Sequence, residues 1–169
     1  MHKLALAAVA VATACTVSPA FAACDTINSK VLKLSACIEE NDWVVQPKQG
    51  DQEFLYFSPD EKVGFTIITE AASFTASDFR NAVLINGKAA NGDKDVAIIA
   101  ERVENVGDKP WNVIEYQFGE AGQELEFQNF YYSQPGFGSV QVVFWSIPGD
   151  ATVAAYRAGR VLSTLNYGN

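Results

Sequence analysis

The sequence predicts an α+β domain built on a mainly antiparallel sheet, with helices packed on both faces. Segments rich in β-branched and aromatic residues, which favour strands, outnumber the helix-like segments. Turn-forming glycines and prolines separate the later strands at short intervals, as expected for antiparallel hairpins. The strands of the last hairpin carry apolar residues on both sides, which indicates that both faces of the sheet are covered.

The N-terminal residues 1–22 have the features of a signal peptide. Lys3 precedes a short apolar run, and residues 20–22 (AFA) form a small-x-small cleavage site. Ser18 and Pro19 break the run before it is long enough to span a bilayer. We therefore expect cleavage after residue 22 and a periplasmic or secreted mature protein.

Two cysteines, Cys24 and Cys37, follow this leader, and in an oxidising compartment they predict a disulfide. A continuous helix between them would separate them by roughly 20 Å, whereas a disulfide needs Cα atoms roughly 6 Å apart. The chain must therefore fold back or interrupt that helix if the bond forms. The alternative is a lipoprotein anchored at Cys24, for which the preceding FAA is a poor attachment signal.

The first half of the chain predicts two helices and three extended segments. Residues 23–42 are expected to form an N-terminal helical segment that holds the cysteine pair, with its helix at 28–41. Extended segments are predicted at 43–45, 53–58 and 63–70. A second helix is expected over 75–86, because Thr75 or Ser77 can cap its start and Gly87 can end it.

The second half predicts four strands and a closing helix. The strands are expected at 95–104, 111–118, 125–133 and 139–147, with turns at 119–123 and at Pro135-Gly136. Asp150 is the expected cap of a helix over 151–165, and the polar tail after it is expected to fray. We expect residues 43–169 to form one domain.

Residues 124–146, ELEFQNFYYSQPGFGSVQVVFWS, concentrate aromatic side chains in one hairpin. Neither strand is apolar on one side only, so most of these rings are predicted to lie in the core beneath helices. Tyr131, Tyr132 and Trp145 are the exceptions, since each combines a ring with a polar group near a strand end. These three residues are the candidate binding surface.

The only histidine, His2, lies in the predicted leader. The mature chain therefore lacks the usual general base, the Ser–His and Cys–His nucleophile pairs and any histidine-containing metal site. The hairpin glycines do not form phosphate-binding loops. We expect no catalytic residue, cofactor or metal ligand. The formal net charge of −8 disfavours nucleic acid as a partner.

Three segments carry a family resemblance: VGDKPWNVIEYQF, YYSQPGFGSVQVVFWS and IPGDATVAAYRAGRVLSTL. Together with the order of elements over residues 43–166, they resemble the PsbP-like α/β/α sandwich family, which includes exported bacterial proteins of uncharacterised function. The resemblance implies a binding or accessory role without a cofactor. The segment around Cys24 and Cys37 departs from the family pattern, and the family's partners lie in other compartments.

The favoured hypothesis is an exported, non-enzymatic binding or accessory protein of the cell envelope. It would be a monomer, without a transmembrane segment once mature, that binds an unidentified protein or envelope component. One alternative is a glycan hydrolase that uses two carboxylates, roughly 5–9.5 Å apart across an aromatic cleft. The other is a carrier of a small apolar ligand, which needs a pocket of roughly 300 Å³ or more between sheet and helix.

Overall fold

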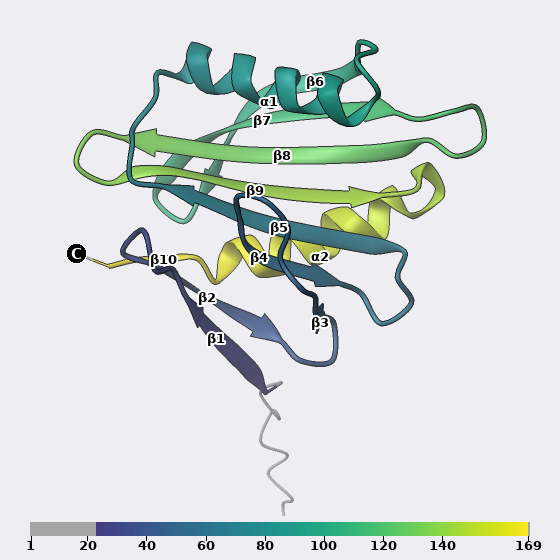
Figure 1. Cartoon of the computed structure of the whole chain (residues 1–169). Helices are drawn as coiled ribbons and strands as arrows, with labels where there is room; N and C mark the ends of the chain where they lie inside the picture. The colour runs from purple at the N-terminus through teal and green to yellow at the C-terminus, as the bar shows by residue number, and fades with distance from the viewer. Residues whose placement is uncertain (1–22, 169) are drawn as a thin grey trace, which may run out of the picture.

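The computed structural model describes residues 23–168, and the predicted signal peptide lies outside these residues. Within this range the chain forms a seven-stranded sheet, a three-stranded sheet and two α-helices (Figure 1). Every strand pair in both sheets is antiparallel. The predicted α+β class with a mainly antiparallel sheet is therefore confirmed.

The large sheet has the strand order β3-β4-β5-β9-β8-β7-β6. Its strands are β3 (Val44–Val45), β4 (Gln52–Phe57), β5 (Val63–Glu70), β6 (Ala97–Val106), β7 (Lys109–Phe118), β8 (Leu125–Gln134) and β9 (Gly138–Ser146). The four strands from β6 to β9 follow one another as hairpins, whereas β9 returns to pair with β5. This return places the last strand of the sheet at its centre.

Helix α1 (Ala76–Ala90) begins as predicted, because the Thr75 side chain accepts a hydrogen bond from the Asp78 amide at 3.1 Å. It continues past Gly87, the predicted end. A Cβ at that position would lie 3.3 Å from both Tyr116 and Val96, so the glycine allows the helix to approach the sheet closely.

Helix α2 (Ala151–Ser163) follows a single 3₁₀ turn at Pro148–Asp150. The predicted cap, Asp150, occupies the capping position but makes no capping hydrogen bond with its side chain. Its carboxylate instead lies 3.6 Å from the Lys62 ammonium group. The position of the helix start was therefore predicted correctly, but the interaction there was not.

The predicted helix at 28–41 is wrong. That part of the chain forms the hairpin of β1 (Cys24–Asn28) and β2 (Leu34–Glu39), and β10 (Asn166–Tyr167) pairs with the other side of β2. Every second residue of β2 is buried, which is the period of a strand and not of a helix. The C-terminal tail, predicted to fray, is thus paired up to Tyr167.

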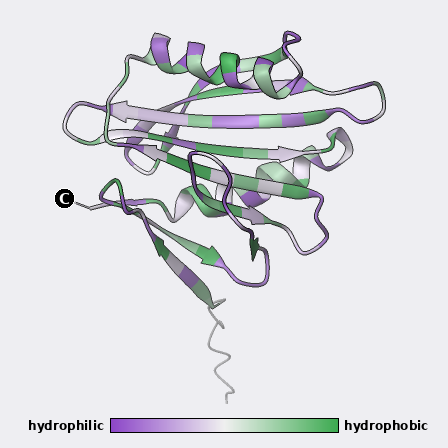
Figure 2. Cartoon of the chain, in the orientation of Figure 1, coloured by the Kyte–Doolittle hydropathy of each residue, from purple (hydrophilic) through white to green (hydrophobic). Residues whose placement is uncertain are grey.

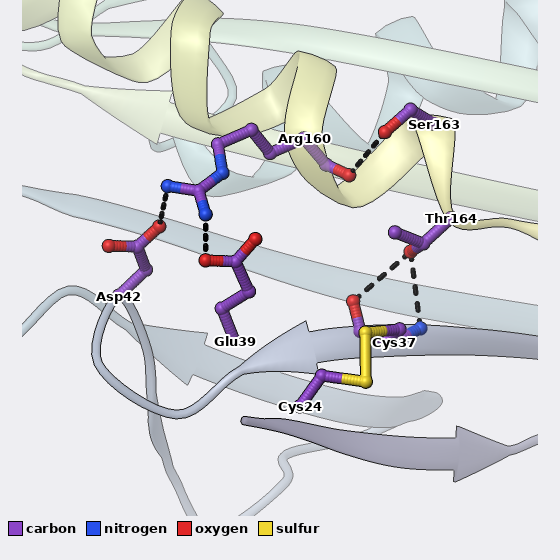
Figure 3. A network of polar contacts seen from close by, with 7 residues as sticks. All are labelled: Cys24, Cys37, Glu39, Asp42, Arg160, Ser163 and Thr164. Carbon is purple, nitrogen blue, oxygen red and sulfur yellow. Dashed lines mark hydrogen bonds and ion pairs between the residues drawn. A yellow bond between two sulfur atoms is a disulfide. The ribbon is translucent and has the colours of Figure 1, made fainter. Parts of the chain in front are cut away.

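The hairpin is held at one end by a disulfide and by polar contacts from two residues, Arg160 and Thr164 (Figure 3). Cys24 and Cys37 form the predicted disulfide, with their Cα atoms 5.4 Å apart. From α2, Arg160 forms ion pairs with Glu39 and with Asp42, the latter at 2.7 Å. The hydroxyl oxygen of Thr164 lies 3.1 Å from both the amide nitrogen and the carbonyl oxygen of Cys37.

The core divides into two clusters of buried side chains. Val113 and Ile114 are neighbours on β7 and each only 1% exposed, yet they belong to different clusters because alternate strand residues point to opposite faces. The larger cluster includes α2 and the β1–β2 hairpin, and the smaller one includes α1. Figure 1 shows the two helices on opposite sides of the large sheet. In Figure 2 both helices mix hydrophobic and hydrophilic residues, as expected for helices that bury one face.

Replacing both Cys24 and Cys37 by serine is expected to lower the free energy of unfolding by about 3 kcal/mol, because the disulfide closes a short loop in the unfolded chain. The far-UV circular dichroism spectrum should stay the same, since the bond lies outside the large sheet. Urea unfolding of the oxidised protein and the double variant measures the difference. Equal stabilities, or loss of the sheet signal at 20 °C, would contradict this account.

Replacing Arg160 by methionine leaves the carboxylates of Glu39 and Asp42 close together without their shared cation. We expect a loss of about 1–2 kcal/mol in the free energy of unfolding, a moderate value because all three side chains keep some contact with water. The control is Arg80→Met, which removes one exposed pair with Glu101 and should cost less than about 1 kcal/mol. Chemical denaturation of both variants tests the order.

Candidate functional site

A groove lies between α1 and the part of the large sheet that this helix leaves uncovered. At one end α1 packs tightly on the sheet, with the Phe79 ring 4.9 Å from the ring of Tyr131. Beyond Val83 and Gly87 the same face opens into a groove of about 410 Å³. Its lining comes from β4, β5, β7, β8, β9 and α1 and includes Thr66, Tyr116, Phe118, Phe127, Asn129, Gln141, Val143 and Trp145.

One wall of the groove is a stack of three aromatic rings. Tyr116 and Phe127 are paired residues of β7 and β8, and their rings are 5.2 Å apart and nearly parallel at 10°. Phe118 lies two residues further along β7, and its ring is 4.6 Å from that of Phe127 at 13°. The antiparallel register therefore brings together rings that are distant in the sequence.

The indole ring of Trp145, which is half-buried, also lines the groove, and Trp145 is the paired residue of Phe127 on β9. Trp145 on β9 pairs with Gly64 on β5, and a Cβ at Gly64 would lie only 2.3 Å from the indole. The missing side chain of Gly64 therefore allows the ring to lie directly over the strand. Phe57 meets the indole edge to face, with ring centres 5.6 Å apart and planes at 79°.

The floor of the groove carries three buried polar side chains: Thr66, Asn129 and Gln141. The Thr66 hydroxyl donates a hydrogen bond to the Phe54 carbonyl at 2.8 Å. By contrast, the Oδ1 atom of Asn129, a residue that is 1% exposed, has no hydrogen-bond partner. The side chain of Gln141 also makes no hydrogen bond to any residue of the range 23–168. The floor thus has one satisfied polar group and two amides with unused hydrogen-bonding atoms.

The groove is electrically neutral. None of the described residues that line it is Asp, Glu, Lys or Arg. Burial raises the pKa of the Tyr116 hydroxyl above its ordinary value, and the neighbouring Asn129 side chain opposes this effect only in part. The phenol therefore stays protonated at neutral pH, and the groove offers hydrogen bonds without charge.

The three residues of the predicted binding surface do not form one surface. Tyr131 is only 4% exposed and lies under α1 against Phe79. Tyr132 points to the opposite face, where its ring stacks on Trp111 with ring centres 5.8 Å apart. Trp145 alone lines the groove. The prediction grouped Tyr131 with Tyr132, although adjacent residues of a strand point to opposite faces.

Other residues of the groove were not identified from the sequence. Asn129 and Gln141 are polar residues in the middle of apolar strands, and this pattern was the available signal. The pattern becomes informative only once the strand register is known. Asn129 pairs with Val143, and Gln141 pairs with Tyr131. This register places both amides on the same face of the sheet.

Residues 23–168 give no support for a metal site or for a free pair of acidic side chains. No group of three or more His, Cys, Asp or Glu side chains in this range could hold a metal ion. Glu39 and Asp42, two acids that lie close together, are both paired with Arg160. Neither of the two helices described is long and apolar enough to cross a membrane.

Comparison with known proteins gives matches to solved structures alone. No family model matches the chain, and no curated protein matches it. The solution structure of cyanobacterial PsbP (CyanoP) from Synechocystis is 12% identical with a TM-score of 0.61, and the match covers 94% of this chain and 99% of that one. The chain has a PsbP-like fold.

Two further structures support the same fold. A protein of unknown function from Pseudomonas aeruginosa is 10% identical with a TM-score of 0.50, and the match covers 86% of this chain and 98% of that one. A structure from Bacteroides thetaiotaomicron is 18% identical with a TM-score of 0.55, and its match covers 81% of this chain but 46% of the longer one. At these sequence identities, the similarity of this chain to the three structures shows a shared fold and nothing about function.

Replacing Gly64 by alanine is expected to displace the Trp145 indole, because the new methyl group would overlap it. The indole should then become more exposed, and the tryptophan emission should shift to longer wavelength by several nanometres. The same substitution in a Trp145→Phe background serves as the control, where Trp43 and Trp111 report on the core. A shift of equal size in that background would show that the indole is not the group that moves.

Proposed function

We propose that the protein is an exported, non-enzymatic binding protein that holds a small, uncharged, mainly apolar molecule in the groove beside α1. The observation that carries this proposal is a neutral groove of about 410 Å³ with aromatic walls. Ligand pockets in proteins have volumes of roughly 300–1,000 Å³, with mostly apolar linings and a few polar groups. The groove has these properties, and a single chain forms it without a second copy.

Export is supported by two features. The leader-like composition of residues 1–22 predicts secretion. The Cys24–Cys37 disulfide is of the kind that persists in oxidising compartments such as the periplasm. With its sulfur in the disulfide, Cys24 is not free to carry a lipid, so we favour a periplasmic or secreted protein over an anchored one.

A binding role is favoured over carboxylate-based hydrolysis by the composition of the groove. A glycosidase of that type needs two carboxyl groups on either side of its substrate. No aspartate or glutamate is among the described residues of the groove. The apolar-ligand hypothesis needed space between sheet and helix, and the groove lies there.

The proposal predicts that the purified mature protein binds prodan, an uncharged naphthalene probe whose emission shifts to the blue in an apolar site. Replacing Ala90 by tryptophan should weaken binding at least tenfold, because Ala90 lines the groove at the end of α1 and a large ring there would fill it. Fluorescence titration measures the affinity.

The matched control is Ala89→Trp. Ala89 is also exposed near the end of α1, but it does not line the groove. This variant should bind prodan as the wild type does, and both variants should melt within a few degrees of the wild type. The proposal fails if the wild type does not bind, or if Ala90→Trp and Ala89→Trp bind equally well.

A further inference from the structure

We propose that the groove selects molecules with an N–H and a C=O group side by side, as in a lactam or another cis amide, and that Gln141 is the residue that recognises this pair. The inference rests on the proposed function, because it names the chemical class of the ligand for the same groove. It follows from the polar atoms on the floor and from the absence of charge among the described residues around them.

Gln141 is the main polar group of the floor. It lies in the middle of β9, between Ile68 on β5 and Tyr131 on β8, and is 8% exposed. No residue of the described chain hydrogen-bonds its side-chain amide, which can donate two hydrogen bonds and accept others. The nitrogen and oxygen of this amide are not among the buried atoms without a partner, so both are accessible from the groove. The arrangement leaves this hydrogen-bonding capacity to a molecule in the groove.

Asn129 adds a second unused acceptor. It is a diagonal neighbour of Gln141 on the adjacent strand, a relation that places the two residues roughly 7–8 Å apart on one face. Its Oδ1 atom is buried without a hydrogen-bond partner, and its side chain lines the same groove. The floor therefore holds both amides with unused atoms, and the rings of Phe127 and Trp145 also line the groove, as do the more exposed amides of Gln52 and Asn86.

These features exclude most ligand classes in favour of one. A charged ligand would lose its hydration without meeting an opposite charge, since the described lining is neutral. A pure hydrocarbon would leave the Gln141 amide unpaired. A cis amide presents a donor and an acceptor on one edge, and the primary amide of glutamine can meet both at once with two hydrogen bonds. A flat ring that carries this edge can also stack on the aromatic side chains that line the groove.

Two probes test this inference directly: 2-quinolone and N-methyl-2-quinolone. Both are flat, uncharged bicyclic lactams, and the methyl group removes the N–H donor while keeping the carbonyl. The wild-type protein is expected to bind 2-quinolone about tenfold more tightly, the difference that one hydrogen bond of ordinary net strength produces. Isothermal titration calorimetry measures both affinities.

The decisive variant is Gln141→Leu, which keeps the size of the side chain and removes the amide. It should fold at least as stably as the wild type and bind both quinolones with affinities within about twofold of each other. The matched control is Gln128→Leu. Gln128 pairs with Phe144 and so lies on the other face of the sheet, and this variant should keep the tenfold preference.

The outcomes separate this inference from the proposed function. Equal binding of the two quinolones by the wild type, or a preference that survives in Gln141→Leu, would overturn the role of Gln141. Binding of prodan without binding of either quinolone would overturn the amide class while the groove stays the binding site. Failure of all three probes would overturn the proposed function and this inference with it.

Discussion

The register in which β9 pairs with β5 and β8 is the constraint on which the rest of the structure depends. β9 lies at the centre of the large sheet, and its residues alternate between the two faces. Phe144 is fully buried in the cluster that includes α2, whereas its neighbours Val143 and Trp145 line the groove. A shift of one residue would exchange these sets and place Gln141 in the apolar core.

The groove exists because α1 covers only part of this face of the sheet. The sheet is wider than the helix that lies on this face, and α1 stays close to one end through Phe79 and Val83. Gly87 lets the last turns of the helix approach Tyr116, which forms the side of the groove nearest the helix. The uncovered remainder is not a polar solvent face, because the rings of Phe118, Phe127 and Trp145 occupy it. A sheet face with this many aromatic side chains is typical of a face that another element or molecule covers.

Local patterns in the sequence predicted the elements of the large sheet and the start of α1 well. β5 was predicted at its observed bounds, and Thr75 caps α1 as expected, because both depend on nearby residues. The segment 28–41 was misassigned because its apolar residues fit a helix as well as a strand. Ala36 and Ile38 are buried while Cys37 between them is half-exposed, a period of two that the disulfide geometry also favours.

The site could be predicted only in part, since it depends on pairing between strands that are distant in the sequence. Trp145 was identified from its own chemistry as a ring with a polar group. Asn129 and Gln141 could not be placed on a common face until the offset of β8 against β9 was known. Tyr131 and Tyr132 were grouped in the prediction, although the alternation of side chains along one strand places them on opposite faces. Of the residues that line the groove, the predicted binding surface therefore contained Trp145 alone.

The three polar residues of the floor show how structural and functional polarity differ on one surface. Thr66 satisfies its hydroxyl within the fold, through the carbonyl of Phe54 on the neighbouring strand. Asn129 and Gln141 lie at comparable depth, and each leaves hydrogen-bonding atoms unused within the described chain. Leucine at position 129 would remove the unpaired Oδ1 atom, but it would also remove the side-chain contact with the Tyr116 hydroxyl. Departures of this kind from an otherwise consistent apolar surface are expected where a protein binds something. The unused amides therefore support the proposed binding site more specifically than the volume of the groove or its aromatic rings do.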